Sequence, residues 1–296
     1  MPRTVQTAAQ VISAADVFAN RRFPLTVRKH AGHGPTKCHR HEFHELVVIL
    51  AGHGRHITPR ETYTISAGDV FLLTEADSHS YTNTRNLTLA NILFDPHRLH
   101  LPWADVGDIP GYQALFRLEP RLRSQNRLRS RLQLTADELA VAAQVIERMH
   151  VELRKQNPGY RFAACVCLMD LILYLSRCYT TATSAPESDA ILRIGAVLSH
   201  IEKHFAEPIR VLQLAQLAHM SESSLLRTFR QVMGTSPLDH VIRVRISKSL
   251  ELLRHADVRV TEAAFQCGFH DSNYFARQFR QVTGRTPREY QKASRT

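Results

Sequence analysis

Three histidines and one glutamate stand out in the N-terminal third of the chain because of their spacing. His39 and His41 alternate in "HRHEFHELVVILAG", Glu45 follows four residues later, and His79 lies in "GDVFLLTEADSHSYTN". Imidazole nitrogens and a carboxylate can bind a divalent metal such as Zn, Mn or Fe. The same groups can hold vicinal sugar hydroxyls through directed hydrogen bonds. A third interpretation is that the histidines are merely structural.

The segments around these residues resemble β-strands. Between Phe43 and Pro96, short runs rich in β-branched residues alternate with turns that contain Gly, Pro, Asp and Asn. These runs are "HELVVILAG", "GRHITPRETYTI", "GDVFLLT" and "LTLANILFD". The pattern predicts a small antiparallel barrel or sandwich.

The spacing HxHxxxExxxxxxG, which ends at Gly52, resembles the first cupin motif, and Gly68, His79 and Asn83 resemble the second. The resemblance implies a barrel in which both motifs meet on one wall. We therefore take four residues as ligand-pocket candidates: His39, His41, Glu45 and His79. No cofactor is required, although the same four residues could hold a divalent metal.

The second motif departs from the cupin pattern, because Thr74 and Ala76 stand where cupins usually carry Pro and Gly. Residues 38–117 are also similar to the sensors of the L-rhamnose operon activators, in "HEFHELVVILAGHGRHI", "SHSYTNTRNLTLANILF" and "IPGYQALF". This resemblance implies a small-molecule effector, such as a sugar like L-rhamnose. Cys38 could join a metal site, but we expect it to be incidental.

The spacing of the apolar residues changes to a helical one at Thr135. The capping box "TADE" at Thr135 begins a helical apolar pattern that runs to about Asn157, and Tyr160 to Tyr179 forms a second apolar stripe. The two helices should pair antiparallel. The stripe can be core, or it can extend to a partner subunit, and from it we predict a homodimer.

The phrase "FRQVMGTSP" (229–237) returns almost unchanged as "FRQVTGRTP" (279–287). Each copy closes an apolar helix, a tight turn and a second helix, which is the pattern of a helix-turn-helix. Ser221 and Asp271 are placed to cap the second helices, and Gly234 and Gly284 to end them. A repeat scaffold is the alternative, but solenoids usually need at least three units.

Between the repeats, Pro237 to Ala256 is a continuous helical pattern of about 20 residues, roughly 30 Å long. That length is close to one turn of DNA, about 34 Å. Two second helices could thus enter successive major grooves. The net charge of +11 agrees with an anionic partner such as double-stranded DNA.

Residues 189–296 resemble the DNA-binding domain of the AraC/XylS transcription regulators, most closely in "VTEAAFQCGFHDSNYFARQFRQVTGRTPREY". One departure is Ser249, where the family usually has Ala. The resemblance implies base contacts by Ser223, Leu226, Arg227, Asp271, Ser272, Asn273 and Arg277. Phosphate-contact candidates are Arg230, Arg243, Arg245, Lys248 and Arg280, for each of which a solvated face or an internal ion pair is the alternative.

Length and composition agree with two domains in a reducing cytoplasm. The 296 residues exceed one usual domain, the first twenty contain no signal-peptide core, and five cysteines form an irregular set. The most apolar stretch, Ala163 to Leu175, is 13 residues long and is predicted to be a buried helix rather than a membrane span.

The predicted fold class is α+β, with a cupin-like β-barrel and a helical pair followed by an all-α domain. The predicted boundaries are 1–134 for the sensor, 135–179 for the helix pair, 180–188 for a linker and 189–296 for the DNA-binding domain. We expect a non-enzymatic regulator, an activator that would contact RNA polymerase. The alternatives are a metal-dependent cupin enzyme fused to a DNA-binding module, and a ligand-independent DNA-binding protein.

Overall fold

The computed structural model of the protein describes residues 10–20, 22–59, 61–75, 77–124, 132–181, 186–254 and 258–293. The chain forms two compact units, Met1–Leu192 and Arg193–Thr296. The boundary falls within helix α7 (Pro186–His204), a few residues beyond the predicted start of the second domain. Of the predicted linker, 182–185 lie outside the described residues, and its two ends belong to helices.

The N-terminal unit is built on an antiparallel sheet in the order β2-β7-β4-β6-β8, with β5 also paired to β4. A separate parallel pair joins β1 to β3. The strand bounds are β1 Gln10–Ile12, β2 Leu25–His30, β3 His39–His41, β4 His44–Ile57, β5 Thr62–Ser66, β6 Asp69–Leu73, β7 Ser80–Phe94 and β8 Leu132–Gln133. The run "GDVFLLT" forms β6 as predicted, and "LTLANILFD" falls in β7, which begins earlier, at Ser80. The first two predicted runs are divided differently: "HELVVILAG" and "GRHI" form the single strand β4, and "TYTI" belongs to β5. The strands β1, β2 and β3 were not predicted.

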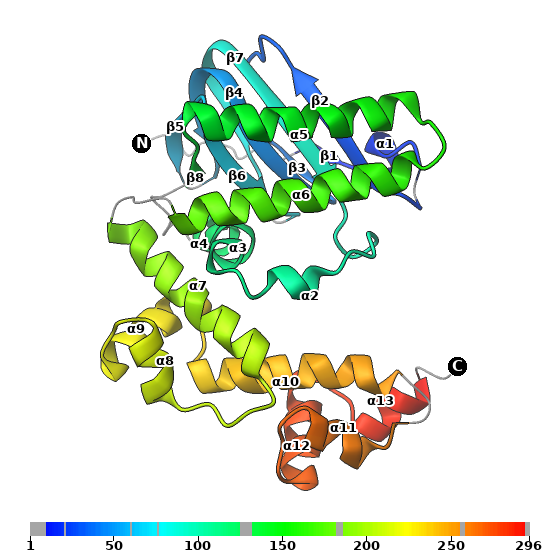
Figure 1. Cartoon of the computed structure of the whole chain (residues 1–296), viewed down its shortest axis with the longest axis vertical. Helices are drawn as coiled ribbons and strands as arrows, with labels where there is room; N and C mark the ends of the chain where they lie inside the picture. Colours follow the sequence, from blue (N-terminus) through cyan, green and yellow to red (C-terminus); the bar gives the residue numbers. More distant parts are fainter. Residues whose placement is uncertain are drawn as a thin grey trace, which may run out of the picture. The chain divides into compact units, whose positions relative to one another are not determined.

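The long β4–β7 ribbon bends in the middle. Its register shifts three times between Ile49 and Arg55, and such bulges bend and twist a strand. Gly52 lies at the bend with a φ of +73°, where an added Cβ would collide with the backbone of Asn86. The sheet therefore curls (Figure 1). Val47 of β4 and Phe71 of β6 belong to one buried hydrophobic cluster.

Seven helical segments complete this unit among the described residues. They are α1 Ala14–Val17, α2 Trp103–Val106, α3 Pro110–Tyr112, the π-helix η1 Gln113–Leu118, α4 Glu119–Ser124, α5 Ala136–Lys155 and α6 Tyr160–Thr181. The predicted capping box begins α5: the Thr135 hydroxyl accepts the Glu138 N–H, and the Glu138 carboxylate accepts the Thr135 N–H. The antiparallel helix pair is thus present, and Arg148 of α5 and Asp170 of α6 are 3.0 Å apart.

Helix α6 is longer than its most apolar stretch suggested. The helix has 22 residues and contains a window with a mean hydropathy of 1.6. By length and composition alone, it is long and apolar enough to cross a membrane. Half of that window is buried inside the protein. Tyr179 of α6 also donates a buried hydrogen bond of 2.6 Å to Glu119 of α4. Packing within the unit therefore accounts for the apolar character of α6.

The described part of the C-terminal unit is helical. After α7 come α8 Val211–Leu217, α9 Glu222–Met233, α10 Pro237–Leu253, α11 Val260–Gln266, α12 Ser272–Thr283 and α13 Pro287–Ala293. The pairs α8–α9 and α11–α12 are the two predicted helix-turn-helix units. Helix α10 connects them and, at 17 residues, is about 25 Å long. It ends before the predicted Ala256, and residues 255–257 lie outside the described part.

The caps of the two second helices are as predicted. The Ser221 hydroxyl accepts the Ser224 N–H, and the Asp271 carboxylate accepts two backbone N–H groups of α12. Gly234 and Gly284 end the helices with φ of +67° and +76°, a conformation that favours glycine. In each helix, two residues of the repeat are fully buried: Leu225 and Phe229 in α9, and Phe275 and Phe279 in α12.

Candidate functional site

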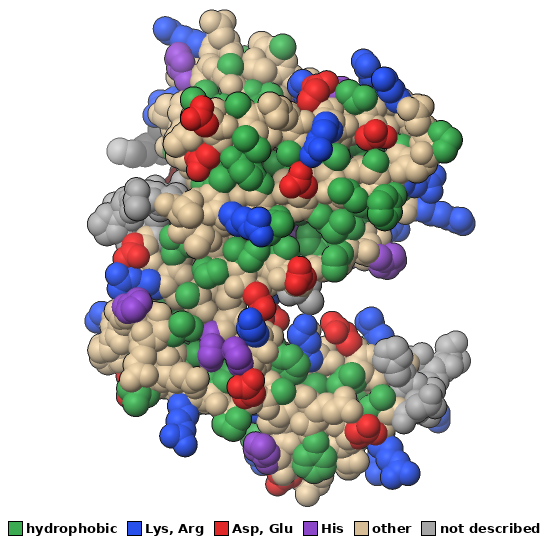
Figure 2. All heavy atoms as spheres, in the orientation of Figure 1, with side chains coloured by type: hydrophobic (Ala, Val, Ile, Leu, Met, Phe, Trp, Pro, Cys, Tyr) green, Lys and Arg blue, Asp and Glu red, His purple; other side chains and the backbone are tan. Residues whose placement is uncertain are grey.

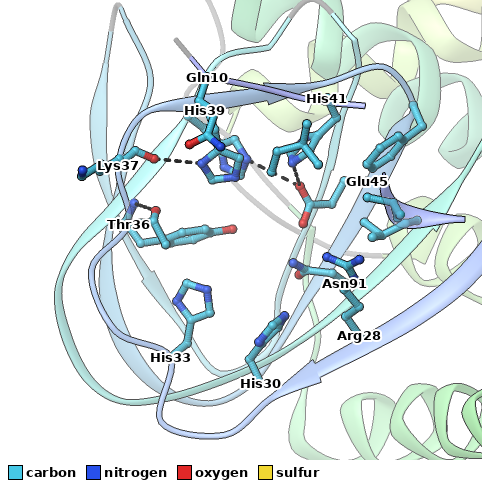
Figure 3. A pocket seen from close by; sticks show the side chains of 16 residues that line it. Gln10, Arg28, His30, His33, Thr36, Lys37, His39, His41, Glu45 and Asn91 are labelled. Atoms are coloured by element: carbon cyan, nitrogen blue, oxygen red, sulfur yellow. Dashed lines mark hydrogen bonds and ion pairs between the residues drawn. The ribbon is translucent and has the colours of Figure 1, made fainter. Parts of the chain in front are cut away.

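A cavity of about 410 Å³ lies inside the N-terminal unit. All four predicted pocket residues line it: His39 and His41 lie on β3, Glu45 lies on β4, and His79 directly precedes β7. Figure 3 shows the side chains of His39, His41 and Glu45 converging. The lining consists of Gln10, Ile12, Val17, Arg28, His30, His33, Thr36, Lys37, His39, His41, Phe43, Glu45, His79, Tyr81, Asn91 and Leu93.

The Glu45 carboxylate is the centre of the predicted set. Its Oε2 lies 3.3 Å from His41 Nε2 and 3.5 Å from His79 Nε2, and all three residues are buried. His39 is more open, and its backbone exchanges two hydrogen bonds with that of His79. One nitrogen from each of the three imidazoles lies within 4.8 Å of the others. These donors fit a divalent metal, and they fit a cluster of hydroxyl groups equally well.

Burial controls the charge of this group. It raises the pKa of Glu45 to about 8, so the carboxyl group is mostly protonated at neutral pH. Burial, with smaller contributions from His39 and Arg28, lowers the pKa of His41 to about 4. Both side chains therefore prefer their neutral forms in the absence of a bound group. A neutral carboxyl and a neutral imidazole each offer one donor and an acceptor, which suits hydroxyl groups.

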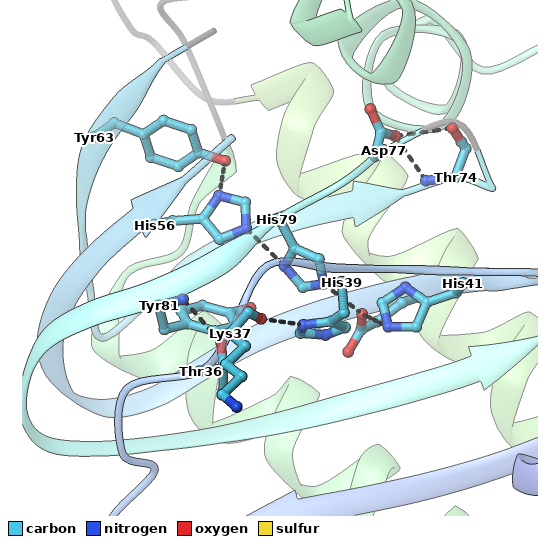
Figure 4. Close-up of polar contacts among 11 residues, drawn as sticks. Thr36, Lys37, His39, His41, His56, Tyr63, Thr74, Asp77, His79 and Tyr81 are labelled. Carbon is cyan, nitrogen blue, oxygen red and sulfur yellow. Dashed lines mark hydrogen bonds and ion pairs between the residues drawn. The ribbon is translucent and has the colours of Figure 1, made fainter. Parts of the chain in front are cut away.

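A second layer of side chains orients His79. His56 Nε2 lies 3.0 Å from His79 Nδ1, and His56 Nδ1 contacts the Tyr63 hydroxyl (Figure 4). His56 is fully buried. This hydrogen-bonded chain directs the other nitrogen of His79 toward Glu45. Sequence reasoning missed His56, although it lies at an inward-facing position of a predicted strand, two residues after Gly54.

The departure from the second cupin motif is accommodated by a local turn. The Asp77 carboxylate accepts the Thr74 N–H and the Thr74 hydroxyl, each at 2.8 Å (Figure 4). Such side-chain turns can replace the conformational preferences of Pro and Gly. The segment before His79 is thus held without them. Ala76 lies outside the described residues.

Several lining residues carried no usable signal in the sequence. Arg28 and His30 lie on β2, which was not predicted, and Asn91 looked like an ordinary polar residue of a strand. His33 lies in a connecting segment and packs edge-on against Tyr81, with ring centroids 5.0 Å apart. Cys38 belongs neither to the lining nor to the three-imidazole cluster.

The DNA-reading candidates lie on α9, and on α12 and its N-cap. Ser223, Leu226 and Arg227 of α9 are exposed, as are Asn273 and Arg277 of α12, whereas Ser272 is half-buried. An exposed face of this kind on the second helix of a helix-turn-helix is the surface that enters the major groove. The structure therefore presents a set of candidate base-reading residues in each of the two helix-turn-helix units.

Both parts of the chain are similar to known protein domains. Residues 27–161 match an AraC-like ligand binding domain, and residues 214–293 match a helix-turn-helix domain. The HTH-type transcriptional activator RhaR of Escherichia coli (strain K12) is 30% identical over 275 residues, which are 93% of this chain and 94% of that protein. The chain belongs to the AraC family of transcription regulators.

Further known proteins are similar over comparable or shorter lengths. RhaR of Yersinia pestis bv. Antiqua (strain Angola) is 28% identical over 288 residues, which are 96% of this chain and 94% of that protein. The solved DNA-binding domain of AdpA, in complex with a target DNA, is 32% identical and covers 35% of this chain and 92% of its own, with a TM-score of 0.33. A probable AraC-family regulator from Rhodopseudomonas palustris CGA009 is 30% identical, covering 35% and 98%, with a TM-score of 0.34.

The five phosphate-contact candidates of this AraC-family chain do not share one environment. Arg230, Arg243 and Arg280 are exposed. Arg245 instead donates hydrogen bonds to the backbone carbonyls of Phe205 and Glu207, at 2.6 and 2.8 Å. These contacts favour the alternative of an internal role for Arg245, which joins α10 to the segment after α7.

Three further residues of the AraC-type domain have partners of their own. Lys248 is half-buried and lies over the Phe205 ring at 6.0 Å, so its amine is less available to phosphate than those of the exposed arginines. Asp271 uses its carboxylate to cap α12, which weakens the expectation that it reads a base. The buried Ser249 hydroxyl donates to the Ile246 carbonyl at 2.7 Å, so the departure from Ala leaves no unpaired polar group.

Proposed function

We propose that this AraC-family regulator is a transcription activator whose effector, a hydroxylated small molecule of sugar size, binds in the cavity of the N-terminal unit. The observation that carries the proposal is the convergence of His41, Glu45 and His79 on one buried polar wall. The two RhaR relatives, whose names describe activators, support the sign of regulation. The sequence resemblance to L-rhamnose operon activators makes L-rhamnose the first probe.

The effector would act by favouring one arrangement of the two units on DNA. A ligand shifts such an equilibrium only by its difference in affinity for the two states. The direct test measures binding to an operator fragment by fluorescence anisotropy, with and without sugar. A sugar that binds the protein but leaves operator occupancy and transcription by RNA polymerase unchanged would contradict the proposal.

The imidazole cluster bears on the rival interpretation, a metal-dependent enzyme. His39, His41 and His79 could hold a divalent cation, which would supply a Lewis acid to a bound oxygen. The relatives of known function are transcription regulators, and a regulator needs only binding from this wall. We therefore favour a non-enzymatic sensor in the cytoplasm that requires no metal.

Chelation separates the two interpretations. We expect protein treated with a chelator to bind L-rhamnose, or a closely related sugar, with the affinity of untreated protein, because His41, Glu45 and His79 supply the polar groups themselves. Calorimetry before and after chelation measures this, and elemental analysis of the untreated protein is the control. Binding that disappears with the metal and returns when it is added back would contradict the proposal.

The helix pair α5–α6 is the proposed dimer contact. Val141, Phe162 and Val166 are large apolar side chains that are 42%, 77% and 43% exposed on these helices. Figure 2 shows hydrophobic side chains gathered over this face. Exposed apolar patches of this kind are typical of interaction sites.

A fragment of residues 186–296 should therefore be a folded monomer that binds one DNA site weakly, because it lacks α5 and α6. The intact chain should dimerise and occupy paired sites. Light scattering at micromolar concentration measures both states, and Phe162→Ser should weaken the dimer of the intact chain. A dimeric fragment, or a monomeric intact chain, would rule out this division of labour.

A further inference from the structure

Many of the residues that line the cavity carry basic groups. Glu45 is the only acidic residue among the described residues of the wall, which also carries Arg28 and Lys37. The Arg28 guanidinium stays charged. The wall therefore carries two basic side chains against one acid. Five imidazoles also line the cavity: His30, His33, His39, His41 and His79. Such a wall attracts an anion more strongly than a neutral sugar.

Arg28 occupies a defined place in this wall. It lies directly opposite Asn91 in the register of β2 and β7, and facing residues of neighbouring strands have Cβ atoms about 4.5–5.5 Å apart. Figure 3 shows both side chains on the same side of the cavity, near Glu45. Within the described parts of the chain, Arg28 forms no hydrogen bond or ion pair. Its fork of donors is available to a ligand.

Two buried polar atoms of the lining also have no hydrogen-bond partner among the described residues. They are Asn91 Oδ1 and His41 Nδ1, on side chains that are 9% and 3% exposed. Burying a polar group without a partner is costly, so these atoms indicate that a polar ligand completes the site. They can hold hydroxyl groups while Arg28 holds a charge.

We propose that the cognate effector is a sugar acid, whose carboxylate is bound by the Arg28 guanidinium and whose hydroxyls meet Asn91, His41, Glu45 and His79. This rests on the proposed effector role of the cavity. A planar carboxylate matches the two parallel N–H groups of a guanidinium. Phosphate is a poorer fit, since phosphate sites typically use helix N-termini, whereas here nearly all lining residues lie on strands and the segments between them.

Matched pairs of sugars test the charge. Calorimetry on the full chain would compare L-rhamnose with L-rhamnonate, D-galactose with D-galacturonate, and D-glucose with D-glucuronate. We expect at least one acid to bind about ten- to a hundredfold more tightly than its neutral partner, the effect of one charge-assisted contact. Neutral sugars that bind as tightly as their acids in every pair would overturn the sugar-acid inference and leave the effector role of the cavity intact.

Variants test the assignment to Arg28. Arg28→Gln should lose most of the preference for the acid and change binding of the neutral sugar less than threefold, while Arg28→Lys should retain part of the preference. Arg55→Gln is the matched control, because Arg55 is an exposed arginine of β4 outside the lining. Equal losses in Arg28→Gln and Arg55→Gln, or binding of no sugar or acid, would overturn the inference. Operator binding measured on the same samples reports separately on the regulator function.

Discussion

Arg227→Ala is expected to weaken binding to the cognate operator by about 1–3 kcal/mol and to relax selectivity at one base position. Arg227 is exposed in the middle of α9, and an arginine in the major groove can bind guanine O6 and N7 with two hydrogen bonds. Binding to unrelated DNA should change little, because phosphate contacts supply most non-specific affinity.

Asn273→Ala should have the same effect in the other half of the operator. Asn273 is exposed in the first turn of α12, and its amide can pair with adenine N6 and N7. If α9 and α12 enter successive grooves, the double variant should lose the sum of the two energies, since separate sites usually add. Competition binding with every single-base variant of the operator measures the loss at each position.

Matched controls lie further along the same helices, about one turn beyond Arg227 in α9 and about two turns beyond Asn273 in α12. Arg230→Ala and Arg280→Ala should weaken binding to all sequences alike and reduce the slope of log affinity against log salt by about 1 each. Both side chains are exposed and lie in the last turns of α9 and α12. If Arg227→Ala or Asn273→Ala behaves like these controls, the residue contacts phosphate and does not read a base.

His79→Ala is expected to abolish the response to effector while leaving effector-free DNA binding intact. The imidazole connects two layers, because Nδ1 meets His56 at 3.0 Å and Nε2 lies 3.5 Å from Glu45 at the cavity. Without this imidazole, His56 loses its contact with Nδ1, and Glu45 loses one of the two imidazoles that lie beside its carboxylate. The DNA-reading residues lie in the other compact unit, so their fold does not depend on this side chain.

The measurement is operator occupancy against effector concentration, together with calorimetric binding of the effector. His53→Ala is the matched control, because His53 is an exposed histidine of the same β4 strand and does not line the cavity. His79→Gln keeps a polar group near the position of Nε2 and should recover part of the affinity. Near-UV circular dichroism would show whether the N-terminal unit remains packed. A normal response in a well-folded His79→Ala protein would remove His79 from the site.

The sequence by itself determined the elements whose signals are local. Ser221 and Gly234 cap α9 as predicted, and Phe229 and Phe279 are buried at equivalent positions of the two helix-turn-helix units. Caps and helical periodicity depend on residues three or four positions apart, which the sequence displays directly. The same holds for the capping box of α5. The resemblance to the cupin motifs implied that His39, His41, Glu45 and His79 would share one wall, and all four line the cavity.

Only the tertiary structure decided which other residues join them. Arg28 and Asn91 are 63 positions apart in sequence, and they face each other because of the register between β2 and β7. A shift of one residue would turn Arg28 to the opposite face of the sheet, and nothing local specifies that register. Likewise, Arg243 and Arg245 look equivalent in the sequence, yet the chain after α7 supplies carbonyl partners to Arg245 alone of the two. Contacts between distant segments thus decide which arginine is available to DNA and which cation faces the effector.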